Sequence, residues 1–183
     1  MRHLPTPISK ADYTGGLKEH TLAVRLYAID APETAKFGNP GQPFAEEATK
    51  FVEEKLLRKR VSMKLLSKDK YGRALGAVSY QEIAFPYIKG KMVDISEELV
   101  TRGLAVVYRQ GGANYDGNVA KWNALENSAK KRKVGIWSQN AKNIQLPSDY
   151  KKKTGGNEKD RGTMKPSKRG IRRYQEVSGD FPL

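Results

Sequence analysis

The 183-residue sequence contains no cysteine and only two histidines, His3 and His20. The lack of cysteine excludes a disulfide framework, a thiolate zinc site and a cysteine nucleophile. Two histidines make a histidine-rich metal site or a Ser-His-Asp triad a poor interpretation. No run is long or apolar enough to span a bilayer, and residues 1–10 lack the apolar stretch of a secretory signal. We therefore expect any chemistry to come from carboxylates, cationic side chains and bound ligands.

The chain is strongly basic, with 34 Lys and Arg against 20 Asp and Glu and a formal net charge of +14. Such an excess favours a polyanionic partner such as nucleic acid, although a ribosome-associated or membrane-surface protein could carry the same charge. The hydrophobic fraction of 38% suits one modest core with a polar appendage. The length agrees with one domain plus appendages.

The most informative stretch is residues 24–33, Val-Arg-Leu-Tyr-Ala-Ile-Asp-Ala-Pro-Glu. It begins with the alternation of a strand and ends in a turn, because Pro32 cannot continue a strand ladder. Asp30 and Glu33 on such a turn offer hard oxygen ligands to a divalent cation, and Arg25 on the strand can bind a phosphate. This set is sufficient for metal-assisted phosphodiester cleavage. The other interpretation of these ten residues is a surface strand whose charges are solvated.

A second motif, Lys-Asp-Lys-Tyr-Gly-Arg at residues 68–73, lies between two strand-like runs at 61–66 and 74–80. Asp69 and Gly72 are turn formers, so the segment predicts a hairpin turn. This turn presents two lysines, an aromatic ring and a second arginine.

Together the two motifs resemble the staphylococcal-nuclease-like (thermonuclease) family. That family carries Arg-Leu-x-x-Ile/Val-Asp-x-Pro-Glu and Asp-Lys-Tyr-Gly-Arg in this order. Residues 103–108 (Gly-Leu-Ala-Val-Val-Tyr) and 135–138 (Gly-Ile-Trp-Ser) also match family landmarks. The resemblance covers about Thr21 to Gln139, and the run Phe-Gly-Asn-Pro-Gly-Gln-Pro-Phe at 37–44 is similar to the eukaryotic, fungal-type endonuclease branch.

Composition and periodicity alone predict a small α+β domain. The resemblance implies an OB-type five-stranded β-barrel with about three helices and with its first strand in doubt. Apolar spacing predicts helices from Pro43 and from Val119, and Asp94 with Glu97 predicts a capping box for a short helix between them. The expected organisation is a loop-like segment (1–19), the nuclease-like domain (20–140) and a disordered basic tail (141–183).

The resemblance also implies the roles of individual residues. Asp30, helped by the backbone carbonyl of Ala31, would bind one calcium ion, and Glu33 would orient or deprotonate water. Arg25 and Arg73 would hold the phosphate from two sides. The residues expected to contact nucleic acid are Lys70, Tyr71 and Tyr108.

The sequence departs from the family at its beginning. The family has an earlier strand with an Asp-Gly-Asp-Thr-like turn that supplies another metal ligand, and no such turn precedes Arg25. We expect either that Asp12 replaces this ligand or that the segment lies outside this chain. The resemblance further implies a monomer without a small-molecule cofactor. It leaves the compartment open between intracellular settings, including mitochondria, with membrane contact only through an upstream anchor.

The leading functional hypothesis is thus a divalent-metal endonuclease acting on DNA, RNA or both with little sequence preference. The alternative is a noncatalytic nucleic-acid-binding OB module derived from a nuclease, which the missing upstream turn favours. A Tudor-type methyl-arginine reader would need an aromatic cage, and the sequence has no clustered aromatic residues to build one.

Overall fold

The structure is a computed structural model of the chain and describes residues 21–36, 38–69, 71–84 and 88–155. The expected N-terminal segment 1–19 with Asp12, the expected binding residue Lys70 and the last part of the expected tail, 156–183, lie outside the described residues.

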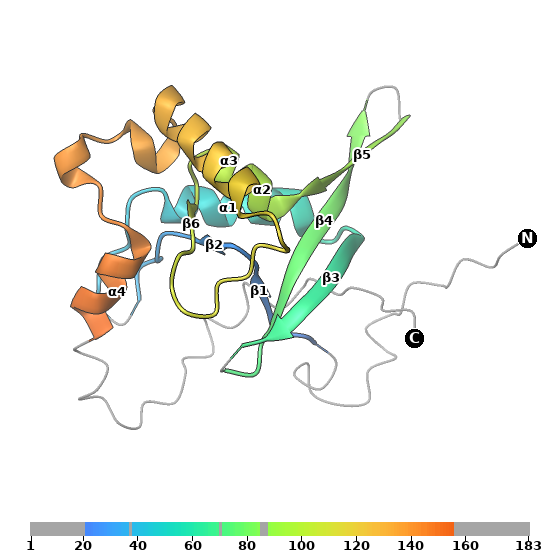
Figure 1. The fold of residues 1–183 in the computed structure, drawn as a ribbon, viewed down its shortest axis with the longest axis horizontal. Helices are drawn as coiled ribbons and strands as arrows, with labels where there is room; N and C mark the ends of the chain where they lie inside the picture. Colours follow the sequence, from blue (N-terminus) through green and yellow to red (C-terminus); the bar gives the residue numbers. More distant parts are fainter. Residues whose placement is uncertain (1–20, 37, 70, 85–87, 156–183) are drawn as a thin grey trace, which may run out of the picture.

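Six strands, four α-helices and two short 3-10 helices occupy the described part of the chain (Figure 1). In chain order they are β1 (Val24–Leu26), β2 (Ile29–Asp30), α1 (Ala45–Leu56), β3 (Val61–Lys68), β4 (Ala74–Ala84), β5 (Ile88–Asp94), α2 (Ile95–Thr101), β6 (Val106–Val107), α3 (Val119–Arg132), η2 (Gly135–Ser138), η3 (Ala141–Asn143) and α4 (Pro147–Gly155).

Strand β4 is the centre of the main sheet. Along one edge it pairs antiparallel with β3, from Val61 opposite Tyr80 to Lys68 opposite Ala74. Along the other edge it pairs first with β1 in parallel and then with β5 antiparallel. The strands β2 and β6 pair with each other in a second, two-stranded sheet. The parallel pairing with β1 places the first motif beside the start of β4. This is the point where the chain leaves the hairpin motif at residues 68–73.

The hairpin turn between β3 and β4 is confirmed. The backbone N–H of Asp69 donates to the Arg73 carbonyl at 2.9 Å, and the N–H of Gly72 donates to the Asp69 carbonyl at 3.0 Å. Gly72 has a φ of +81°, a conformation that glycine adopts without strain. The turn residues of the motif therefore fix the position from which Arg73 leaves the hairpin.

The predicted helices are also present. The Asp94 carboxylate caps α2 by accepting hydrogen bonds from the N–H groups of Ser96 and Glu97. Helix α1 buries Ala48 and Phe51 on one face, as their spacing predicted. No helix in the described ranges combines the length and the apolar content needed to cross a membrane.

The core lies between the main sheet and helices α1, α2 and α3. Trp122 of α3 is 1% exposed and belongs to the core, where its ring meets Tyr27 edge-on with 5.1 Å between centroids. At Gly103, after α2, the φ is +67° and an added Cβ would lie 2.2 Å from the Val134 carbonyl oxygen. A side chain at this position would therefore separate α2 from η2.

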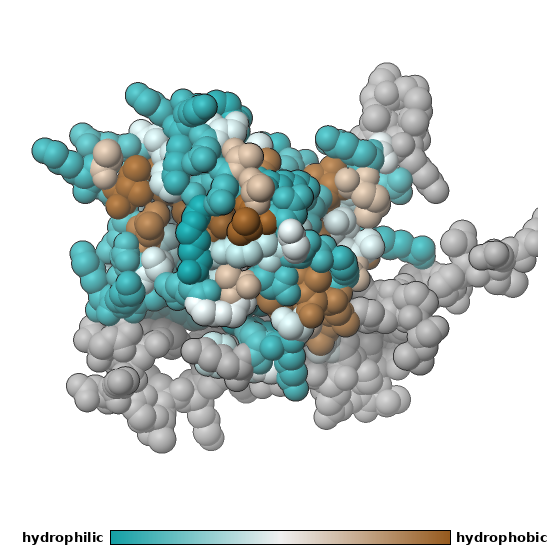
Figure 2. Space-filling view, in the orientation of Figure 1, coloured by the Kyte–Doolittle hydropathy of each residue, from teal (hydrophilic) through white to brown (hydrophobic). Residues whose placement is uncertain are grey.

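The predicted closed barrel is not formed by the described residues. β1 and β3 pair with opposite edges of β4, and neither pairs with the other within the described ranges. Closure of a barrel requires the end strands of a sheet to meet. Leu65 of β3 is 54% exposed, and Figure 2 shows an apolar patch over the β3–β4 hairpin on a mainly hydrophilic face. The α+β class is correct, and the described strands of the main sheet form an open sheet.

The predicted disordered tail is wrong for residues 141–155, which form η3 and α4. The buried side chain of Gln42 donates from Nε2 to the Gln145 carbonyl at 2.9 Å, and the Tyr150 hydroxyl donates to the Pro40 carbonyl. Figure 1 shows α4 beside the segment that follows β2. The sequence pattern missed this helix because, apart from the buried Pro147 at its start, it has no apolar stripe and docks through polar contacts.

Candidate functional site

Asp30 and Glu33 lie where β2 ends. Asp30 pairs with Val106 across the two-stranded sheet, and the chain then turns at the buried Pro32. The side chain of Asp30 is only 12% exposed, whereas that of Glu33 is 36% exposed. The strand-turn predicted from the sequence is therefore present, and it holds one shielded and one accessible carboxylate three residues apart.

The two carboxylates face one positively charged atom. The Nζ of Lys151, in α4, lies 2.6 Å from Asp30 Oδ1 and 3.2 Å from Glu33 Oε1. Burial acts to lower the pKa of Lys151, but the hydrogen bond and the charge of Asp30, together with Glu33, outweigh it and raise the pKa. This group of Asp30, Glu33 and Lys151 is called the carboxylate cluster below.

The carboxylate cluster allows a test of whether these residues suit a divalent cation. Asp30 and Glu33 already direct one oxygen atom each at the ammonium nitrogen of Lys151. This positive group stands in for a metal cation. Carboxylate oxygens are the ligands that calcium prefers. A group of three or more His, Cys, Asp or Glu suited to a metal is absent from the described residues. The two carboxylates therefore suit a cation, with the Ala31 carbonyl next to Asp30 in sequence as the expected further ligand.

Gln42 fixes the loop that carries Glu33. Its Oε1 accepts from the Glu33 N–H at 3.0 Å, and its own N–H donates to the Glu33 carbonyl at 2.8 Å. Gln42 is 6% exposed, and its Nε2 bonds the Gln145 carbonyl, which precedes α4. One buried amide thus connects the Glu33 turn to the segment that delivers Lys151. Sequence reasoning missed Gln42, because a glutamine in a Gly- and Pro-rich loop carries no signal of burial.

Arg25 lies on β1 and stacks on a predicted nucleic-acid contact. Its Cζ lies 4.4 Å from the centroid of the Tyr108 ring. Tyr108 directly follows β6, and its N–H donates to the Ala28 carbonyl at 2.8 Å. Ala28 lies between β1 and β2 in the first motif. The structure therefore brings Arg25 and Tyr108 together, and the aromatic face restricts the directions in which the guanidinium can point.

Arg73 is held within its own hairpin. Its Nε donates to Asp69 Oδ2 at 2.7 Å, and Asp69 Oδ1 accepts from the N–H groups of Tyr71 and Arg73 at 2.9 Å each. Burial acts to raise the pKa of Asp69, but the hydrogen bonds from Arg73 and Tyr71 override it and lower the pKa. The Arg73 Cζ lies 5.5 Å from the centroid of the Tyr71 ring. Asp69, Tyr71 and Arg73 are called the hairpin cluster below.

The strand register relates the two arginines. Arg25 lies opposite Leu75 of β4, and the Ala74 N–H donates to the Ala23 carbonyl at 2.9 Å. Continuing this register by one residue places Arg73 opposite Ala23, and Ala23 is two residues before Arg25 in the chain. Because side chains alternate along a strand, we expect both arginines on the same side of the sheet.

A cavity of about 300 Å³ opens beside Asp30. Two of the predicted site residues, Asp30 and Tyr108, line it, whereas Arg25, Glu33 and Arg73 do not. The lining residues are Asp30, Val106, Val107, Tyr108, Arg109, Gln110, Glu126, Lys130, Trp137, Leu146, Ser148 and Lys152.

Glu126 on the cavity wall supports the strand that pairs with Asp30. Its side chain is 2% exposed and accepts from the Val107 N–H at 2.9 Å, from Arg109 at 2.9 Å and from Lys130 at 2.8 Å. Burial acts to raise the pKa of Glu126, but these hydrogen bonds lower it below the ordinary value. The charged carboxylate therefore anchors β6 to α3.

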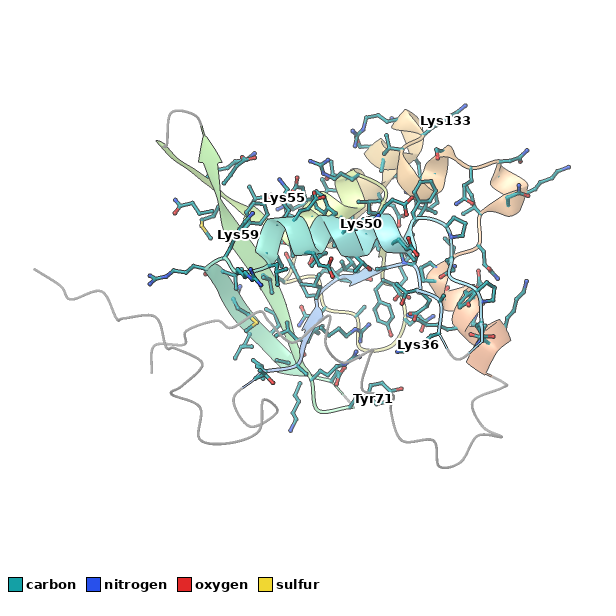
Figure 3. The ribbon with its side chains drawn as sticks, turned by 180° about the vertical axis from the view of Figure 1, so that it is seen from behind. Lys36, Lys50, Lys55, Lys59, Tyr71 and Lys133 are labelled. Atoms are coloured by element: carbon teal, nitrogen blue, oxygen red, sulfur yellow. The ribbon has the colours of Figure 1, made fainter. Side chains whose placement is uncertain are left out.

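Exposed cationic and aromatic side chains lie around these clusters. Figure 3 places Tyr71 at the tip of the β3–β4 hairpin and Lys36 on the loop after β2, along one edge of the molecule. Tyr71 is 71% exposed, as a stacking residue must be. Lys50 and Lys55 lie on α1 and Lys59 lies just after it, and all three are away from this edge.

Comparison with known proteins identifies relatives over most of the chain. Endonuclease Htp3 of Saprolegnia parasitica is 42% identical over 152 residues, which is 82% of this chain and 68% of that protein. Probable endonuclease LCL3 of Verticillium alfalfae is 40% identical over 78% of this chain and 48% of its own length. Probable endonuclease lcl3 of Schizosaccharomyces japonicus is 43% identical over 75% of this chain and 58% of its own length.

A family described as "Staphylococcal nuclease homologue" matches residues 23–139. The matched range contains both sequence motifs, the hairpin cluster and the carboxylates Asp30 and Glu33, but it ends before Lys151. The chain therefore belongs to the staphylococcal nuclease homologue family, together with these endonuclease-named relatives.

Proposed function

We propose that this chain is a divalent-metal-dependent endonuclease that hydrolyses phosphodiester bonds of DNA, RNA or both with little sequence specificity, and that calcium is its ion. Membership of the family and the endonuclease names of its relatives support a hydrolytic nuclease. The single observation that carries the metal-dependent proposal is the convergence of Asp30 and Glu33 on one cationic atom.

The reaction needs its charges balanced. A phosphodiester is anionic and repels an approaching hydroxide, so catalysis must neutralise the phosphate and stabilise the charge that grows in the transition state. Asp30 and the Ala31 carbonyl would hold the ion, which supplies positive charge beside the phosphate when bound. Glu33, the more exposed carboxylate, is placed to orient water and accept its proton.

Arg25 and Arg73 supply the opposite half of the site. Two guanidiniums with fixed directions bind a trigonal-bipyramidal oxyanion better than a ground-state diester, and this difference accelerates the reaction. The Tyr108 ring limits the motion of Arg25, and Asp69 limits that of Arg73. Tyr71 and Lys70 would contact neighbouring nucleotides, since an exposed ring stacks on any base.

The noncatalytic nucleic-acid-binding module is the second candidate. One observation favours it: Lys151 already pairs with both carboxylates and offsets one of their two negative charges, and the described residues offer no group of three His, Cys, Asp or Glu side chains suited to a metal. A binding module would keep the basic surface while its former metal ligands are held in an internal ion pair.

The test uses the 183-residue chain with single-stranded DNA and RNA of mixed sequence. We expect cleavage in calcium, none after chelation, and recovery when calcium is restored, because without the ion Asp30 and Glu33 repel the substrate phosphate. The same reactions are run on a version extended by any upstream Asp-Gly-Asp turn. If both versions bind nucleic acid and neither cuts it in calcium, the binding module is the better answer.

A further inference from the structure

Helix α4 places a cation on the two carboxylates that the proposed reaction needs. Lys151 Nζ bonds Asp30 Oδ1 at 2.6 Å and pairs with Glu33 Oε1 at 3.2 Å, from a position 121 residues later in the chain than Asp30. The side chain of Lys151 is 46% exposed and that of Asp30 only 12%. The ammonium therefore covers the shielded carboxylate while its own outer side remains in contact with solvent.

The lysine and a divalent ion would occupy the same place. Calcium binds carboxylate oxygens at about 2.3 to 2.6 Å, and the Lys151 nitrogen lies 2.6 Å from Asp30 Oδ1. Two cations at such distances from one oxygen would repel each other strongly, because like charges that close cannot be screened by water. Occupation of the position beside Asp30 Oδ1 by one of them therefore strongly disfavours the other there.

Other contacts keep the lysine near the site even when its ammonium is displaced. The Tyr150 hydroxyl donates to the Pro40 carbonyl, and Gln42 holds the Gln145 carbonyl at 2.9 Å. Neither contact involves the carboxylate of Asp30 or Glu33. The tether raises the effective concentration of the ammonium at the carboxylates, so that it can compete with a free ion.

We propose that Lys151 is an internal competitor for the divalent cation, which must displace its ammonium from Asp30 and Glu33 in order to bind. The inference rests on the proposed function, because it takes Asp30 as a ligand of the ion. As a consequence, the apparent affinity for the ion equals the intrinsic affinity multiplied by the fraction of molecules in which Lys151 is undocked.

The first measurement is a calorimetric titration of the 183-residue chain with calcium. Lys151→Met keeps an unbranched side chain and removes the charge, so calcium should bind on the order of tenfold more tightly. Lys151→Arg keeps a cation and should remain near the wild-type affinity. The matched control is Lys153→Met, which removes the same charge from an exposed position of α4 that faces another direction.

A second measurement separates displacement from a general effect of charge. Side-chain NMR of the lysine ammonium groups, with the Lys151 signal assigned by its loss in Lys151→Arg, should show that signal moving to the position of a solvated lysine as calcium is added. The double variant Asp30→Asn, Glu33→Gln should show the solvated position without calcium. If the Lys151 signal does not respond to calcium, the inference is wrong, even if Lys151→Met binds the ion more tightly.

The outcomes also separate this inference from the proposed activity. Cleavage in calcium with equal calcium affinity in wild type and Lys151→Met would overturn the inference and leave the nuclease proposal standing. Displacement of Lys151 by calcium, without cleavage by this chain or by the extended version, would support the inference and overturn the nuclease proposal. If neither wild type nor Lys151→Met binds calcium at millimolar concentration, the inference that Lys151 competes with calcium is wrong.

Discussion

The carboxylate cluster and the hairpin cluster carry opposite charges of one proposed site, but the chain assembles them in different ways. In the hairpin cluster, Asp69 and Arg73 are four residues apart and share one turn. In the carboxylate cluster, Asp30 and Lys151 are 121 residues apart and meet only because α4 docks on the loop after β2. The cationic half of the site is therefore a local property of one hairpin, whereas the state of the anionic half depends on a distant helix.

This difference predicts different responses to perturbation. A change within the hairpin should alter the phosphate clamp and leave calcium binding intact, because the Asp69–Arg73 ion pair does not involve the carboxylates. A change in the contacts of α4 should alter calcium binding and leave the hairpin intact. Four substitutions test this comparison.

Arg73→Ala should have the largest effect. Removal of a donor that stabilises the transition-state oxyanion typically lowers turnover by about 100- to 1000-fold, and we expect this range in calcium-dependent cleavage assays. The control is Arg60→Ala, which removes an exposed arginine before β3 and should retain activity. Calcium affinity should not change in either variant, and a loss smaller than about tenfold for Arg73→Ala would mean that the hairpin does not hold the reacting phosphate.

Glu33→Gln tests the carboxylate cluster directly. Loss of a general base costs roughly 100-fold or more in turnover, while binding of uncleaved DNA should stay close to wild type because the phosphate clamp is untouched. Single-turnover cleavage and a separate binding titration distinguish the two quantities. Glu54→Gln, at an exposed position of α1, serves as the control. Equal losses of binding and turnover would assign Glu33 to substrate binding instead of water activation.

Gln42→Ala tests the link between the Glu33 loop and α4. The substitution removes the hydrogen bonds to the Glu33 N–H and the Gln145 carbonyl, which should lower the free energy of unfolding by about 1 to 2 kcal/mol in denaturant titrations. The matched control is Gln81→Ala, an exposed glutamine bonded to the Gly90 carbonyl at 3.3 Å, for which we expect a change within about 0.5 kcal/mol. Similar values for both variants would show that Gln42 does not connect the loop to α4.

Asp69→Asn should have the smallest effect. The amide oxygen can still accept from the turn N–H groups, so the hairpin should form, but the charged partner of Arg73 is lost. Turnover should fall only about three- to fivefold, the scale of one partly exposed ion pair. Kinetic assays together with circular dichroism measure the two effects. A loss as large as that of Arg73→Ala would show that the hairpin cluster acts as a unit.

Much of the fold could be predicted from local pattern. The Asp94 cap, the amphipathic α1 and the β3–β4 turn follow from residues that lie within a few positions of one another. Whether the sheet closes could not be predicted in this way, because closure depends on strands that meet from distant parts of the chain. α4 was missed for a related reason: it docks through one buried proline, Pro147, and single polar contacts, so it has no apolar stripe to reveal it.

For the proposed site, the sequence by itself determined the candidate residues and the local turns that carry them. Pro32 ends the strand beside Asp30, and Gly72 closes the turn before Arg73, because their backbone preferences act over two or three residues. Only the tertiary structure decided what these residues meet. Lys151 and Gln42 look like solvated polar residues in the sequence, since the free energy that docks or buries them comes from partners more than a hundred positions away.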